Sequence, residues 1–189
     1  MIRAAMILFA STGLFGLSAH AAAPRWHADA TTGRLEFVGT QAGAEFTGEF
    51  GEFSADVRFA PDALDSSRFD VQIATGSVDT ADAERDGIIR GPDLFAVERH
   101  PEARYVADRF ERTDEGFRAV GQLTLRGTTR PVPIDFRFRR DGDSARLEGS
   151  ARIERLDFGV GQGEWQDTQW VGNDVLIRFD LVLQPAGAP

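Results

Sequence analysis

Apolar and polar residues alternate along most of this chain with a period of two. One side of each alternating run collects Phe, Val, Ile, Leu and Ala, and the other side carries Asp, Glu and Arg. A period of two is typical of a β-strand with one buried face. The runs with this pattern are Leu35–Phe37, Phe53–Phe59, Phe69–Ile73, Phe117–Leu125, Val132–Phe138, Leu147–Ile153 and Val175–Leu183.

Turn residues separate these runs. Asp114-Glu115-Gly116 and Asp141-Gly142-Asp143 predict tight hairpin connections between neighbouring strands. Strands that are each apolar on one face must bury one shared side, and an antiparallel barrel does so without leaving exposed edges. We therefore predict an all-β fold, an extended antiparallel β-barrel of about eight strands. A sandwich of two sheets is the alternative.

The inward face of the predicted barrel mixes bulky side chains with small ones. The small residues are Gly39, Ala44, Gly48, Ala55, Ala119, Gly121, Gly149 and Ala151. A barrel of about eight strands has an interior that side chains fill or that holds one small ligand. Two interpretations therefore stay open: the small residues fit a narrowing barrel, or they leave volume for a ligand.

Residues 78–95, VDTADAERDGIIRGPDLF, interrupt the alternation with a charged, helix-like segment. Thr80 is a candidate N-cap, acidic residues follow in the first turn, and Arg90 stands near the end, as the helix dipole favours. Gly91 can adopt the left-handed conformation that ends a helix, and Pro92 prevents continuation. The pattern predicts one short helix near residues 80–90.

A short helix between strands is suited to capping one end of the barrel. Ile88 and Ile89 are the residues that we expect to hold it by packing. Arg85 and Arg90 could contact the head group of a ligand. Alternatively, Arg85, Asp86 and Arg90 form a salt-bridge network that pins the helix in place.

The first residues of the chain are typical of a secretory signal peptide. A basic start is followed by an apolar run, Ala4–Leu17, which is shorter than the ~20 residues of a membrane-spanning helix. Ala19 and Ala21 fit the small-residue rule for cleavage. We predict a signal peptide over residues 1–21, a mature domain over residues 22–189 without a transmembrane segment, and export to the periplasm.

Composition excludes several classes of partner and site. The formal net charge of −9 argues against nucleic acids and anionic membrane surfaces as partners. The chain has no Cys, and the two histidines of the predicted mature domain, His27 and His100, stand in no metal-binding pattern. We predict no metal, no catalytic residues and no cofactor other than a bound lipid or quinone.

Motifs in a fixed order connect this sequence to a known family. They are Trp26-His27-x-Asp29, Phe50-Gly51-Glu52-Phe53, Ser77-Val78-Asp79-Thr80, Arg85-Asp86-x-x-Ile89-Arg90, Asp93-Leu94-Phe95, His100-Pro101, Gly121–Gly127, Pro131-Val132 and Arg155–Val160. The ordered set resembles the YceI-like family of bacterial secreted proteins and covers essentially the whole mature chain.

The resemblance implies a lipocalin-like barrel that holds an isoprenoid or other amphiphilic lipid in an elongated apolar cavity. The expected cargo is a polyprenyl phosphate or an isoprenoid quinone. The candidates for lining the cavity are Phe37, Phe46, Phe53, Val57, Phe59, Phe69, Val71, Ile73, Ile88, Phe95, Leu123, Leu125, Ile134, Phe136, Phe158, Trp170 and Ile177. The candidates for the head group or the cap are Arg85, Asp86 and Arg90.

Two alternatives accompany the carrier hypothesis. The first is a stress-response scavenger that sequesters apolar toxins or drugs, which differs from the carrier only in its ligand. The second is an enzyme that acts on a lipid at the barrel mouth with His100, Asp86 and Arg90. The sequence shows no nucleophile and base pattern for such a reaction.

Overall fold

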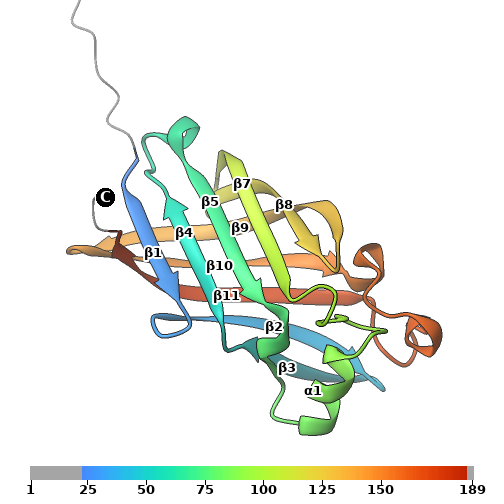
Figure 1. The fold of residues 1–189 in the computed structure, drawn as a ribbon. Helices are drawn as coiled ribbons and strands as arrows, with labels where there is room; N and C mark the ends of the chain where they lie inside the picture. The colour runs from blue at the N-terminus through green and yellow to red at the C-terminus, as the bar shows by residue number, and fades with distance from the viewer. Residues whose placement is uncertain (1–22, 187–189) are drawn as a thin grey trace, which may run out of the picture.

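The computed structural model describes residues 23–186, which form a closed antiparallel β-barrel (Figure 1). The predicted signal peptide, residues 1–21, lies outside the described residues. The strands are β1 Arg25–Asp29, β2 Gly33–Gln41, β3 Ala44–Phe50, β4 Phe53–Arg58, β5 Arg68–Ala74, β6 Val78–Asp79, β7 Glu102–Thr113, β8 Gly116–Leu125, β9 Thr128–Asp141, β10 Ser144–Glu154 and β11 Asp174–Pro185.

Strand β11 closes the barrel because it pairs with both β1 and β2. Trp26 of β1 lies opposite Pro185, and Phe37 of β2 lies opposite Ile177. Strands β1 and β2 therefore follow each other along one edge of β11. Strands β3 and β4 pair with them in turn, and β5 and β6 pair with β4 and β3. The ring consequently has eight strand positions, as the sequence predicts.

Apart from Phe59, which follows β4, the alternating sequence runs fall in strands, and their apolar positions point inward. Strand β7 has no such run in the sequence analysis, although it is one of the longest strands. Its inward residues begin with Ala103, Tyr105 and Ala107, and a register shift between Ala107 and Arg109 then brings Phe110 inward. Small inward residues and a β-bulge together hide the period of two.

The predicted helix is present as α1, Ala83–Arg90. Its N-cap is Asp82 rather than the expected Thr80, because the Asp82 carboxylate accepts hydrogen bonds from the backbone of Glu84 and Arg85 at 3.1 and 3.0 Å. The hydroxyl of Thr80 instead donates to Asp86. The expectation of a left-handed Gly91 is also wrong, since its φ is −64° and its ψ 169°.

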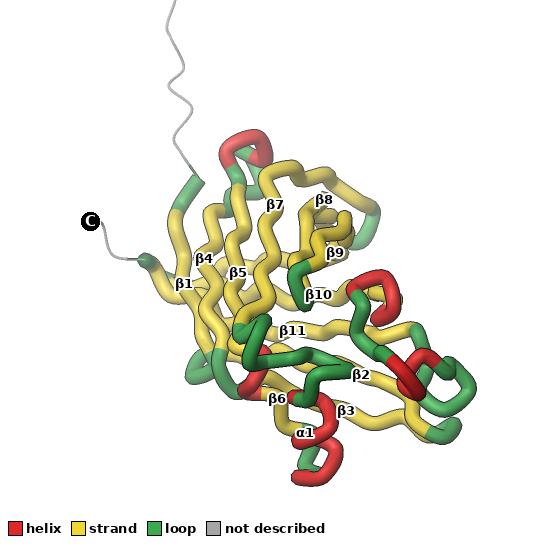
Figure 2. The backbone as a smooth tube through the Cα atoms, turned by 45° about the vertical axis from the view of Figure 1, so that its right-hand side comes forward, coloured by secondary structure: helices red, strands yellow, loops and turns green. Residues whose placement is uncertain are grey.

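Short 3₁₀ turns complete the fold: η1 Leu64–Ser66, η2 Thr75–Ser77, η3 Arg155–Phe158 and η4 Gly163–Gln166. Turns η3 and η4 and helix α1 gather at one end of the barrel (Figure 2). The backbone amides of Gly161 and Gln162, between η3 and η4, donate to Asp93 O at 2.9 Å. These bonds connect the η3–η4 segment to the segment that follows α1. No helix within residues 23–186 is long and apolar enough to cross a membrane.

An aromatic cluster fills the other end of the barrel. Its centre is Phe59, which follows β4 and is fully buried. The surrounding rings lie with their centroids 5.0–6.0 Å from that of Phe59; they belong to Phe69, Phe110, Phe117, Phe136 and Phe138. This end, at the arrowhead of β4, is remote from α1 (Figure 1). The barrel is therefore packed solid at one end only.

Candidate functional site

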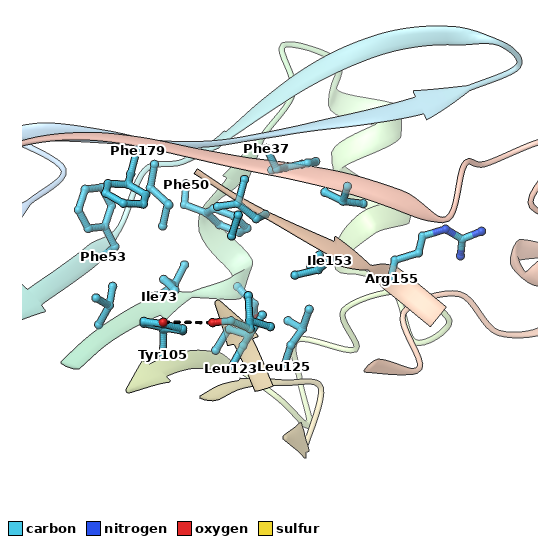
Figure 3. A pocket seen from close by; sticks show the side chains of 18 of the residues that line it. Phe37, Phe50, Phe53, Ile73, Tyr105, Leu123, Leu125, Ile153, Arg155 and Phe179 are labelled. Carbon is cyan, nitrogen blue, oxygen red and sulfur yellow. Dashed lines mark hydrogen bonds between the residues drawn. The ribbon is translucent and has the colours of Figure 1, made fainter. Parts of the chain in front are cut away.

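The barrel encloses an apolar lumen between the aromatic cluster and α1. The volume of this cavity is about 210 Å³. Every strand position contributes Phe, Leu, Ile, Val or Ala side chains to the wall, and Ile89, Leu94 and Phe95 cover the α1 end. In Figure 3, Phe37, Phe53 and their neighbours face Leu123 and Leu125 across this space.

Few polar side chains line the lumen, and the described hydrogen bonds direct them into the wall. The Tyr105 hydroxyl donates to Val132 O at 3.1 Å, and the Thr75 hydroxyl donates to His100 O at 2.7 Å. Burial raises the pKa of the Tyr105 phenol. Because these groups are already bonded to the backbone, the lumen presents an apolar wall to a ligand.

Among the described residues, Arg155 is the one charged side chain on the lumen wall, and it is only 4% exposed. Its Nε donates to Gly172 O at 2.9 Å, its Nη1 to Val160 O at 2.9 Å and its Nη2 to Val171 O at 2.8 Å. No carboxylate of the described chain lies within 4.0 Å of it, and burial lowers the pKa of the guanidinium. In Figure 3 the guanidinium points away from the labelled apolar side chains.

These three bonds give Arg155 a structural role. All three acceptors belong to the segment of residues 160–172, which forms part of the rim beside α1. A planar guanidinium can hold several carbonyls at once, which an ammonium cannot do with the same geometry. Arg155 thereby fastens this rim segment to the end of β10.

A second hollow adjoins the lumen, and we call it the vestibule. Its lining residues are Gln41, Phe46, Asp82, Glu84, Arg85, Ile88, Ile89, Leu94, Trp165 and Val171. It shares Phe46, Ile89, Leu94 and Val171 with the lumen, so the two hollows meet at these side chains. The site as a whole is an apolar lumen that adjoins a vestibule lined by both apolar and charged side chains.

Arg85 extends across the vestibule from α1. Its Nε donates to Gln41 Oε1 at 3.3 Å, and its Nη2 lies 3.5 Å from the Asp82 carboxylate. Its guanidinium also lies 4.6 Å from the centroid of the Phe46 ring, in a cation–π arrangement. Arg85 therefore links α1 to the strands β2 and β3.

Arg85, Asp86 and Arg90 do not form the salt-bridge network considered from the sequence. Asp86 is buried and accepts hydrogen bonds from the amide and the hydroxyl of Thr80 at 2.9 and 2.7 Å. Arg90 donates to Gly76 O at 2.8 Å and to Val78 O. Each of the three side chains fastens α1 separately, through partners outside the helix or at its cap.

Most of the candidate lining residues meet in the lumen. Those that line it are Phe37, Phe46, Phe53, Val57, Phe69, Val71, Ile73, Phe95, Leu123, Leu125, Ile134 and Ile177. They come from seven different strands and from the segment after α1. Apart from Phe46 and Phe95, which stand in no alternating run, these residues converge because alternate positions of each strand point inward.

Five candidates lie elsewhere. Phe59 and Phe136 do point inward, but they belong to the packed aromatic cluster. Phe158 is buried in η3 away from the lumen. Ile88 lines the vestibule with 38% of its surface exposed, and Trp170 is 53% exposed. Alternation shows which way a side chain points, but not whether other side chains fill the space before it.

The structure also shows lining residues that the sequence analysis did not single out. Ala103 and Tyr105 come from the unrecognised strand β7. Arg155 carried no signal of burial, because arginine is mostly an exposed residue type. Leu35 and Phe179 do stand in alternating runs, so their pattern could have identified them.

The sequence left two interpretations of the small inward residues, a narrowing barrel or free volume for a ligand. The inward glycines have a third role. A Cβ at Gly48 would collide with the ring of Phe37, and one at Gly121 would collide with the ring of Tyr105. At Gly39 it would lie 3.0 Å from the ring of Phe46. These glycines therefore make room for neighbouring aromatic rings, which in turn shape the lumen wall.

The structure does not join His100, Asp86 and Arg90, the residues proposed for an enzyme, by hydrogen bonds within residues 23–186. Asp86 and Arg90 are bound to Thr80 and to backbone carbonyls, as described above. The described chain also holds no group of three His, Asp or Glu side chains that is arranged to bind a metal.

Comparison with protein families gives one clear match. The model of the YceI-like domain matches residues 26–183. Among curated relatives, a UPF0312 protein of Azotobacter vinelandii is 33% identical over 144 residues, or 72% of this chain and 74% of that protein. A UPF0312 protein of Serratia proteamaculans is 32% identical over 119 residues, which cover 60% of this chain and only 62% of that protein's length.

Solved structures share the fold. The crystal structure of Burkholderia cenocepacia BcnA has a TM-score of 0.75 and 30% sequence identity, and the match covers 82% of this chain and 98% of that one. A polyisoprenoid-binding domain from Saccharophagus degradans, implicated in plant cell wall breakdown, has a TM-score of 0.66 and 17% identity, with 85% and 98% coverage. At that identity the second likeness concerns the fold alone.

Proposed function

The chain belongs to the YceI-like family, and we propose that it is a periplasmic carrier that holds the tail of a long isoprenoid-type lipid in its lumen. The observation that carries this proposal is the apolar lumen, closed by aromatic rings at one end and adjoining a vestibule with charged side chains at the other. An amphiphile has the same division into an apolar tail and a polar head. The description of one protein of this fold as polyisoprenoid-binding supports the same cargo class.

Burial of the tail supplies enough free energy for binding. Each buried CH₂ group contributes ~0.8 kcal/mol, so the contribution to binding grows with every tail carbon that enters the lumen. Loss of translational freedom and ordering of the tail reduce this contribution considerably. An apolar cavity of about 150 Å³ already stays dry and binds benzene. Tight binding therefore needs no strong polar contact inside the lumen.

The direct test is to extract the purified protein with organic solvent and to analyse the extract by mass spectrometry. We expect an isoprenoid quinone or a polyprenyl phosphate in a fixed ratio to protein. Extracts without lipid, together with no uptake of added isoprenoid quinone, would contradict the carrier. Recovery of varied apolar compounds that compete with isoprenoids would favour the scavenger instead.

Export is tested separately, because residues 1–21 lie outside the described structure. We expect the full chain to be recovered from the periplasmic fraction with Ala22 as its first residue. A variant that lacks residues 2–21 should stay in the cytoplasm. Recovery of the full chain from the cytoplasm with an intact N-terminus would contradict this location.

A further inference from the structure

We infer that the vestibule selects a lipid with an uncharged, oxygen-bearing head group, such as an isoprenoid quinone, over a polyprenyl phosphate. This inference rests on the proposed function, since it concerns the head of the lipid whose tail would fill the lumen. It is carried by the charges that line the vestibule, Asp82, Glu84 and Arg85, and by the partners that the cations at this end of the barrel already have.

Two carboxylates line the vestibule. Asp82 caps α1 through its Oδ1, and Glu84 stands in the first turn of the same helix with its side chain exposed. Both carboxylates lie on the wall of the hollow that would receive the head group. Like charges brought together in a partly enclosed site repel each other, so these two groups oppose a phosphate.

The arginines at this end are already engaged. Arg85 pairs with Asp82 and donates to Gln41. Arg90 and Arg126 donate to backbone carbonyls on either side of α1, at Gly76 and Pro92 among others. A phosphate would have to compete with these partners for each cation.

Arg155 is buried and has no carboxylate partner in the described chain. Its three nitrogen atoms each donate to a carbonyl of the rim segment. It lines the lumen and not the vestibule, so the charged groups of the vestibule wall are Asp82, Glu84 and Arg85. Two carboxylates and one guanidinium give this wall a formal net charge of −1.

A vestibule wall without excess positive charge suits a neutral head group. A phosphate monoester carries about −1.5 to −2 charges at pH 7, and no unbalanced cation of the described vestibule would compensate them. Carbonyl oxygens of a quinone need only a donor, and Nη1 of Arg85 has no hydrogen-bond partner within residues 23–186. Phe46 and Trp165 add aromatic faces to the wall, against which a planar ring can pack.

The experiment offers the mature protein three probes with tails of equal length: an isoprenoid quinone, the corresponding polyprenol and the polyprenyl monophosphate. Native mass spectrometry of the equimolar mixture at pH 7 reports the bound fraction of each. We expect the two uncharged lipids to bind about tenfold more than the phosphate. Preferential or equal binding of the phosphate would overturn this inference and leave the carrier proposal intact. Binding of none would contradict the carrier itself.

Charge variants provide the matched test. Asp82→Asn with Glu84→Gln removes both negative charges, and asparagine remains a good helix cap. We expect binding of the phosphate to rise about tenfold and quinone binding to change little. The control pair, Asp65→Asn with Asp114→Asn, removes the same charge from exposed sites near the opposite end. An equal rise in the control, or no rise in the vestibule variant, would show that the vestibule charges do not select the head group.

Discussion

The rings of Phe59 and Phe69 lie with their centroids 6.0 Å apart, and they mark the boundary between the solid and the hollow parts of the barrel. Phe69 lines the lumen, whereas Phe59 is fully buried behind it. The aromatic cluster around Phe59 thus sets the depth to which a lipid tail can enter. It also supplies much of the core of a domain without disulfides.

Removal of the central ring should test this cluster. Phe59→Ala deletes the side chain that contacts five other phenylalanines, so we expect a loss of about 3–5 kcal/mol in the free energy of unfolding. Urea denaturation followed by Trp fluorescence measures this loss. Phe138→Ala, at a half-buried position of the same cluster, should cost clearly less. Equal losses at both positions would contradict a central role for Phe59.

Tyr105 should make the protein sensitive to alkali. Burial raises the pKa of its phenol in the folded state above the ordinary 10.0, so the unfolded chain loses this proton first. The stabilisation is complete below pH 10 and is lost as the pH rises from there towards the folded pKa. The chain has one Tyr and no Lys, so few other side chains titrate in this range.

The comparison is between the wild type and Tyr105→Phe. At pH 8 the variant loses the hydrogen bond to Val132 O and should be less stable by about 1 kcal/mol. Above pH 10 the wild type should lose stability with pH more steeply than the variant. Urea midpoints between pH 8 and 11 measure both effects, and parallel curves would disprove the assignment to Tyr105.

Arg155→Lys should loosen the rim segment. One ammonium cannot reproduce three bonds to Gly172, Val160 and Val171, and we expect a loss of about 3 kcal/mol. Hydrogen exchange should become faster in residues 160–172. Arg130→Lys is the matched control, because Arg130 is exposed and makes one long bond to Asp157 O at 3.4 Å. Unchanged exchange in the Arg155 variant would contradict its fastening role.

The sequence predicts the barrel well because alternation reports directly on which face of a strand is buried. Ile73 and Ile177 could be placed on the lumen wall for this reason. Strand β7 was not found, since alanines and a β-bulge hide its period. Phe59 was expected on the lumen wall and Thr80 at the helix N-cap, and both expectations are wrong. The position of Phe59 depends on contacts between segments distant in sequence, and the choice of N-cap depends on a competition between neighbouring side chains.

The central claim is that the lipid tail lies inside the barrel, and two tryptophan substitutions on one strand test it. Ile177 of β11 points into the lumen, whereas Val182 of the same strand is 40% exposed. Ile177→Trp fills the lumen, and Val182→Trp adds the same side chain outside. The measurement is the molar ratio of extracted isoprenoid lipid to folded protein for the wild type and both variants. We predict that Ile177→Trp loses most of its lipid while Val182→Trp retains the wild-type ratio. Equal ratios in all three proteins would contradict the claim.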